Sequence, residues 1–175
     1  PPTPQDLTTD YTTIKATIRL YQSTLLTPSP HDDFMNGKPD ALNDAQQRGL
    51  QTFIDQGCAS CHNGVALGGS MQPFEIAAKY KFSTLGDFKG DENGLVKTPT
   101  LRNITETAPY FHNGAIWSLA EAVTEMGSTQ LGIKISDKES SQIVDFLGAL
   151  KGRKPQIVYP QLPESTLQTP KPDFN

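Results

Sequence analysis

Apolar side chains recur every three or four residues in four segments of the chain, which is the period of one face of an α-helix. The first segment runs from Asp10 to Leu26, after a loose polar arm at residues 1–9, and ends before Pro28 and Pro30, which stop a helix. Its apolar positions are Tyr11, Ile14, Ile18, Tyr21 and Leu25. We expect this helix to belong to a larger architecture than the domain that follows.

Three later helices carry capping signals in their first turns. In each, a Ser or Asn that can accept a hydrogen bond from the backbone precedes, by three residues, a Glu or Gln that can bond back. The pairs are Asn43 with Gln46, Ser118 with Glu121 and Ser136 with Glu139. We expect these helices to end at glycines, which adopt the left-handed conformation common after a helix. The glycines are Gly57, Gly127 and Gly152.

The stretches between the helices are rich in glycine, proline and polar residues, so we expect loops there. These loops are residues 27–40, 63–93, with one short helix near 74–80, and 95–114. No strand pattern of useful length competes. The prediction is an all-α fold with long loops. It divides into an N-terminal arm, helix and loop (1–42), a main domain (43–154) and an extended proline-rich tail (155–175).

Composition narrows the range of functions. The net charge is −4 and no block of basic residues occurs, which argues against nucleic-acid binding. No apolar run is long enough to span a bilayer, and the first residues lack the apolar stretch of a signal peptide, so we expect a mature or trimmed protein. Hydrophobic residues make up only 35% of the 175 residues, which is low for a globular domain.

The only two cysteines lie in Cys58-Ala59-Ser60-Cys61-His62, the spacing of a covalent haem c attachment site. In such a site each thiol forms a thioether with a haem vinyl group, and the adjacent histidine ligates the iron. A redox dithiol would need a βαβ context, and a zinc site would need a second ligand pair, whereas His31 and His112 are isolated. A disulfide is the remaining alternative. We predict one haem c, whose apolar ring would compensate for the low hydrophobic content.

The function depends on the sixth iron ligand. Met126 is the preferred candidate, because it ends a short predicted helix and precedes a glycine. A thioether ligand raises the reduction potential, and closing both axial sites favours electron transfer over chemistry at the metal. Met35 and Met71 are weaker candidates. His112 is either the ligand of a bis-histidine haem or a loop residue bonded to a propionate, and Met126 can also be an ordinary core methionine.

Other residues have both a functional and a purely structural interpretation. Arg102 either pairs with a haem propionate or lies at the surface. Trp117, the only tryptophan, is expected in the core rather than in the haem wall. The pairs Asp32-Asp33 and Asp91-Glu92 should be solvated in loops, with a calcium site as the weaker alternative.

Several motifs are more specific than the haem motif alone. They are Ala45-Gln46-Gln47-Arg48-Gly49-Leu50, the haem motif with Asn63-Gly64, Thr98-Pro99-Thr100-Leu101-Arg102-Asn103, Pro109-Tyr110-Phe111-His112-Asn113-Gly114 and Leu119-Ala120-Glu121-Ala122-Val123. With the proline-rich tail, they resemble the C-terminal haem domain of the bacterial di-haem cytochrome c peroxidases over most of the chain. The resemblance implies a class I cytochrome c-like helical haem domain.

The resemblance also implies ligands. In that family the C-terminal haem has a high potential and accepts electrons, with histidine and methionine ligands that match His62 and Met126. Related enzymes that oxidise a protein-bound tryptophan cofactor carry tyrosine instead of the methionine, so Met126 argues against that branch. A calcium between the two domains of the family would be held in part by carbonyls that match Thr107 and Pro109.

The N-terminal haem domain, where that family reduces peroxide, has no counterpart here, and the helix from Tyr11 to Leu26 resembles the segment that joins the two domains. We therefore expect a mono-haem electron-transfer domain that takes electrons from a small redox protein, a cytochrome or a cupredoxin, and passes them to a second centre. Because haem c is attached on the exported side in bacteria, we expect a periplasmic protein. The alternative is peroxide reduction, with the missing domain or after Met126 dissociates, in which His112 or Glu121 assists proton transfer.

Overall fold

The computed structural model describes residues 4–25, 27–86, 90–159, 161, 164–167 and 169, and describes side chains from Asp10 onward. Helices dominate and confirm the all-α prediction. They are α1 (Pro4–Thr24), α2 (Pro30–Met35), α3 (Asp44–Asp55), α4 (Leu119–Met126) and α5 (Asp137–Gly148). Short turns of helix are η1 (Pro39–Ala41), η2 (Cys58–Ser60), η3 (Ile104–Glu106) and the π-helical η4 (Gly127–Leu131). The strands β1 (Met71–Pro73) and β2 (Leu95–Lys97) form one antiparallel pair.

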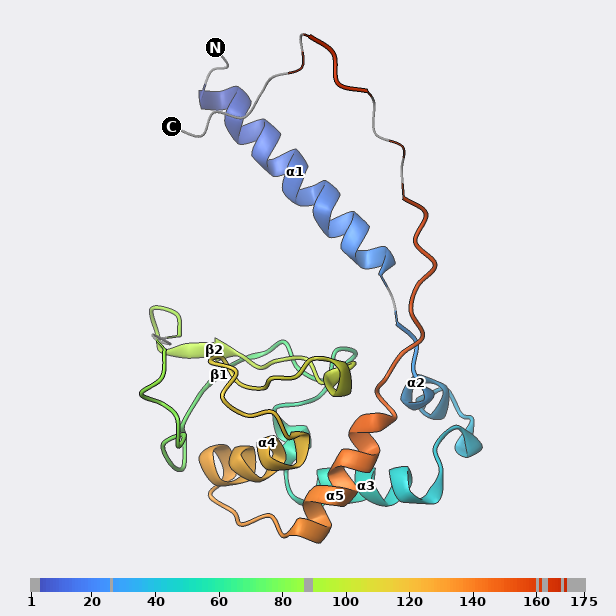
Figure 1. Ribbon diagram of the computed structural model, residues 1–175, viewed down its shortest axis with the longest axis vertical. Helices are drawn as coiled ribbons and strands as arrows, with labels where there is room; N and C mark the ends of the chain where they lie inside the picture. The colour runs from blue at the N-terminus through green and yellow to red at the C-terminus, as the bar shows by residue number, and fades with distance from the viewer. Residues whose placement is uncertain are drawn as a thin grey trace.

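The packing of α3 against α5 forms the centre of the domain (Figure 1). Both helices begin with the predicted capping boxes, Asn43 with Gln46 and Ser136 with Glu139. The helices pack closely because Gly49 has no side chain: a Cβ atom there would lie 2.0 Å from the Gln142 carbonyl oxygen. The main core cluster fills this contact and comprises Phe53, Leu67, Ile143, Phe146, Leu147 and Leu150.

A second, smaller cluster lies under the loops on the other side of the domain. It consists of Tyr80, Tyr110 and Ile116, and Phe111 packs against it. The rings of Tyr80 and Phe111 are stacked, with centroids 4.5 Å apart and planes 15° apart. Asn113 ties this cluster to residues 80–86, since its amide donates to the carbonyls of Phe82 and Leu85 and accepts from the Tyr80 hydroxyl. Of the loop predicted at 95–114, residues 98–114 are thus ordered, whereas residues 95–97 form β2.

The N-terminal segment differs from the prediction. The helix begins at Pro4 rather than Asp10, so residues 4–9 are not a loose arm, and it ends at Thr24; Leu26 and residues 1–3 lie outside the described residues. Residues 30–35, predicted as loop, form α2, because Pro30 suits the first turn of a helix and Asp32 completes a capping box with Ser29. The apolar face of α1 is exposed, and α1 projects from the domain (Figure 1).

Four further predictions are wrong in detail. Residues 74–80 are not helical, and the short β1–β2 pair occurs in a chain for which no strand was expected. The helix that begins after Ser118 does not end at Gly127, whose φ and ψ are helical; the chain continues through η4 and ends at Gly132 in the left-handed conformation. Glu121 does not close a capping box with Ser118, because its carboxylate is bonded to Lys81.

The described part of the C-terminal tail has no regular structure, as predicted, and leaves the domain beside the segment that leads to α2. The Gly152 N–H donates to the side-chain oxygen of Asn103, and the Arg153 N–H donates to the Pro28 carbonyl at 2.9 Å. The chain just after α5 is therefore fastened to the segment before α2 and to the loop that contains Asn103. Within the described residues, no helix is long and apolar enough to cross a membrane.

Candidate haem site

A cavity of about 210 Å³ lies between the two clusters and is lined almost entirely by apolar atoms. Its walls come from every part of the main domain: Phe53 at the end of α3, the Cys58–His62 motif, Phe74 beyond β1, Tyr110 in the proline loop and Met126 on α4. Gly57, at φ +84°, turns the chain out of α3 into η2 and so brings the motif to the cavity. Both cysteines and the histidine line this single cavity.

The His62 ring is held in a defined orientation. Its Nδ1 lies 3.2 Å from the Leu67 carbonyl oxygen, and its ring packs 6.4 Å from that of Phe53. A carbonyl only accepts, so Nδ1 carries the proton and the lone pair of Nε2 remains available to a metal. Burial lowers the pKa of His62, which favours the neutral ring that a metal requires.

The two cysteine thiols are free and half-buried. The Ser60 hydroxyl donates to the Cys61 Sγ at 3.8 Å, and burial raises the pKa of the Cys58 thiol. Among the described residues, no group of three or more His, Cys, Asp or Glu is placed to hold a metal ion, which argues against the zinc alternative. Two thiols and an oriented imidazole beside an apolar cavity fit a covalent haem.

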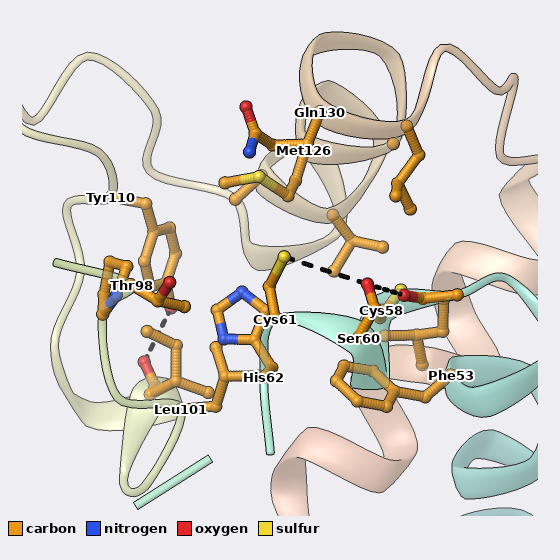
Figure 2. A pocket seen from close by; sticks show the side chains of 18 of the residues that line it. Phe53, Cys58, Ser60, Cys61, His62, Thr98, Leu101, Tyr110, Met126 and Gln130 are labelled. Carbon is orange, nitrogen blue, oxygen red and sulfur yellow. Dashed lines mark hydrogen bonds between the residues drawn. The ribbon is translucent and has the colours of Figure 1, made fainter. Parts of the chain in front are cut away.

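Met126 and His62 approach the cavity from opposite sides (Figure 2). Met126 is the last residue of α4, and its side chain lines the cavity with those of Ala122 and Val123. The other two methionines do not line it: Met35 on α2 is 67% exposed and Met71 on β1 is 47% exposed. Of the three methionines, Met126 is therefore the one that lines the same cavity as His62.

Arg102 does not line the cavity. Its guanidinium forms a bidentate ion pair with Asp32, with one Nη at 2.8 Å from Oδ2 and the other at 2.5 Å from Oδ1, and its Nε donates to the Val65 carbonyl. This pair holds the pKa of the Asp32 carboxyl well below its usual range. Asp32 is therefore not the solvated residue that was predicted, and Arg102 is engaged by a carboxylate of the protein itself.

The other candidates lie outside the cavity. His112 is exposed and packs edge-on against Phe74 and Tyr80. Glu121 is exposed and paired with Lys81 at 2.5 Å. Trp117 is 72% exposed, so its predicted core position is wrong. The preceding residue, Ile116, forms a β-bridge with Tyr110 and is buried, so Trp117 faces outward.

Thr107 and Pro109 lie in an exposed turn around the cis peptide bond between Ala108 and Pro109. The Thr107 hydroxyl donates to the Ile104 carbonyl at 3.2 Å. A calcium site remains a prediction.

Residues 46–151 match the family model described as cytochrome c. The chain belongs to the cytochrome c family. Membership implies that this cytochrome c carries a covalently bound haem c, in agreement with the geometry of Cys58, Cys61 and His62.

Two curated relatives are cytochrome c peroxidases, and they confirm the family expected from the sequence motifs. Cytochrome c551 peroxidase of Pseudomonas aeruginosa is 42% identical over 168 residues, which cover 89% of this chain and 48% of that protein. Cytochrome c peroxidase Ccp of Escherichia coli is 38% identical over 143 residues, which cover 75% of this chain and 31% of that protein. This cytochrome c thus spans half or less of the length of these relatives.

The solved structure of a MauG-like protein associated with microbial copper homeostasis resembles this cytochrome c with a TM-score of 0.56. The identity is 22%, and the match covers 73% of this chain and 53% of that one. At this identity the likeness shows the fold alone, and it agrees with the helical architecture described above.

Some residues of the site were not foreseen. The Leu67 carbonyl orients His62, and Leu67 itself has a positive φ of 48°, but nothing in the local sequence marks it. Gln130 lines the cavity one helical turn after Met126. A signal for Gln130 did exist, since a residue four positions after Met126 shares its face if the helix continues.

Proposed function

We propose that this cytochrome c is a mono-haem electron-transfer domain in which His62 and Met126 are the two axial ligands. The observation that carries the proposal is the placement of these side chains on opposite sides of one apolar cavity that also holds both thiols (Figure 2). When bound, the haem supplies a one-electron ferric–ferrous couple. Cys58 and Cys61 would attach it, and Phe53, Tyr110 and the face of α4 would exclude water.

The ligand pair favours electron transfer over substrate chemistry. A thioether stabilises ferrous iron and raises the reduction potential, and two protein ligands leave no open coordination site. The side chains are also held by their surroundings. His62 is fixed by the Leu67 carbonyl and the Phe53 ring, and Met126 is fixed on α4. A site that does not rearrange between oxidation states suits outer-sphere electron transfer.

The partners follow from the relatives. Because the chain spans half or less of the peroxidases it matches, we infer that it acts as their C-terminal half and delivers electrons to a second, peroxidatic haem centre. A small soluble cytochrome or cupredoxin would supply the electrons. Calcium held partly by the carbonyls of Thr107 and Pro109 would lie between the two halves. We place the protein in the periplasm, where haem c is attached.

The test is the ferric spectrum of the haem-loaded protein and of Met126→Ala. The wild type should show the near-infrared methionine-to-iron band, and Met126→Ala should lack it and have a lower reduction potential. Met71→Ala is the matched control, because Met71 is outside the cavity, and it should keep both properties. A Met126→Ala protein that keeps the band contradicts the ligand assignment.

A second candidate is peroxide reduction by this chain after Met126 leaves the iron. The names of the relatives favour it. The geometry gives it little support, because His112 and Glu121 are outside the cavity and Glu121 is paired with Lys81. Steady peroxide consumption with a reduced cytochrome donor, lost in His112→Ala, would establish this activity. Peroxide consumption no faster than the uncatalysed background, in both the wild type and Met126→Ala, would exclude it.

A further inference from the structure

Residues 73–81, here called the strap, cross α4 and η4 along one side of the cavity. The N–H groups of Ala77 and Ala78 both donate to the Thr129 carbonyl, at 2.9 and 3.2 Å. Further along, the Lys81 N–H donates to the Glu125 carboxylate at 3.0 Å. Beyond Pro73, the last residue of β1, the strap has no helix or strand and is held against α4 and η4 by these bonds.

Gln130 makes the contact nearest the cavity. Its Nε2 donates to the Pro73 carbonyl at 3.1 Å, and its Oε1 accepts from the Ile76 N–H at 3.4 Å. One amide thus holds the backbone at the start of the strap by both of its polar atoms. Gln130 and Met126 line the same side of the cavity (Figure 2).

The π-helical turn explains how Gln130 reaches both partners. The Gly132 N–H donates to the Gly127 carbonyl, five residues earlier, so the turn between Met126 and Gln130 is wider than in an α-helix. The turn is also packed firmly. Thr129 is completely buried, and a Cβ atom at Gly127 would lie 2.5 Å from Cγ1 of Ile135. Wide π-helical turns of this kind recur at functional sites.

We propose that Gln130 is a positioning residue that keeps Met126 at the axial position by locking η4 to the strap. The inference rests on the proposed function, in which Met126 is the sixth ligand. With both hydrogen bonds in place, the C-terminal end of α4 cannot move away from Pro73 and Phe74, and Met126 stays directed into the cavity. Without them, the strap stays bonded at Thr129 and Glu125, but its start at Pro73 and Ile76 is released from η4 and the methionine leaves the iron more often.

The experiment measures how readily an external ligand replaces the methionine. Imidazole binds the ferric protein only when Met126 has dissociated. Its apparent Kd is therefore inversely proportional to the fraction of protein in which Met126 is dissociated. Each of the two neutral hydrogen bonds is worth a change of about two- to tenfold in an equilibrium constant. Gln130→Ala should therefore bind imidazole about tenfold more tightly than the wild type, and lose the near-infrared band at a pH about one unit lower.

Gln51→Ala is the matched control, since Gln51 is exposed on α3 and bonded only within that helix, to Asp55. It should bind imidazole as the wild type does. Gln130→Glu keeps the acceptor for Ile76 but places a carboxylate oxygen against the Pro73 carbonyl, so it should also bind imidazole several-fold more tightly than the wild type. This variant carries the test if Gln130→Ala does not accumulate with haem.

The possible results separate this inference from the ligand assignment. Wild-type imidazole affinity in both Gln130 variants overturns the positioning role while Met126 remains the ligand. If the wild type lacks the near-infrared band, or if Met126→Ala binds imidazole no more tightly than the wild type, the axial role of Met126 itself fails. A Gln130→Ala protein whose affinity changes only as much as that of Gln51→Ala also contradicts the inference.

Discussion

Gly49 is the position at which the contact between α3 and α5 is most sensitive to a single methyl group. A Cβ atom there would lie 2.0 Å from the Gln142 carbonyl oxygen and 2.9 Å from the Phe146 Cβ, whereas ordinary contact begins near 3.4 Å. Gly49→Ala would therefore force the helices apart by more than an ångström. Both close neighbours belong to the backbone or to a Cβ of α5, so no side-chain rotation can relieve the overlap.

The expected loss is at the upper end of the range for an overpacked core, about 3 kcal/mol. For a domain of this size, that lowers the melting temperature by roughly 6–12 °C. The change also reaches the site, because α3 leads into the Cys58–His62 motif and Phe146 packs on Phe53, with ring centroids 5.2 Å apart. We expect a weaker near-infrared band in the folded variant, since the His62 ring packs against the Phe53 ring.

The assay is thermal unfolding of the haem-loaded protein, followed by circular dichroism and by the haem absorbance. Gly148→Ala is the control: it makes the same change in a helix, where nothing lies within 4 Å of the new Cβ. Removing a helical glycine there should stabilise the protein by up to about 1 kcal/mol. The packing argument is refuted if Gly49→Ala melts at or above the temperature of the wild type.

Two further predictions concern the loops around the site. Asp32→Asn should lower the free energy of unfolding by about 1–3 kcal/mol at pH 7, because it removes the charge that Arg102 binds. The pKa of Asp32 is lower in the folded than in the unfolded protein, so its stabilising effect is complete above about pH 4 and declines as the pH falls further; urea titrations should show the two proteins converging below that pH. Asn113→Ala removes the bonds to Tyr80, Phe82 and Leu85, so limited trypsin digestion should cut after Lys81 faster than in the wild type, and equal rates would contradict this role.

Helices α3 and α5 could be predicted because their first turns satisfy their own hydrogen bonds. The capping boxes of α3 and α5 are local and specific, and both are present in the structure. Glu121 shows the limit of this reasoning, because a lysine 40 residues away takes the carboxylate that the cap would have used. Gly127 shows another: its small size serves contact with Ile135 rather than a helix end, and packing partners are invisible in a local pattern.

The same division applies to the site. The attachment motif is contiguous, so Cys58, Cys61 and His62 could be identified from spacing alone, and helical periodicity directed attention to Met126. The ion pair of Arg102 with Asp32 joins residues 70 positions apart. The sequence predicts Arg102 either beside a propionate or at the surface, and Asp32 in solvent. An arginine in such a motif indicates that an anionic partner is present, but the sequence does not show which carboxylate is that partner.

The arrangement of the core explains why a chain with 35% hydrophobic residues can fold around this site. The two buried clusters lie on different sides of the cavity, and among their described neighbours Ile104 and Leu119 pack against both. The main cluster supports His62 through Phe53, and α4, which carries Met126, packs on both clusters through Leu119. An apolar ring in the cavity would therefore join two half-cores that touch only narrowly, so attachment at Cys58 and Cys61 would complete the fold as well as supply the redox centre.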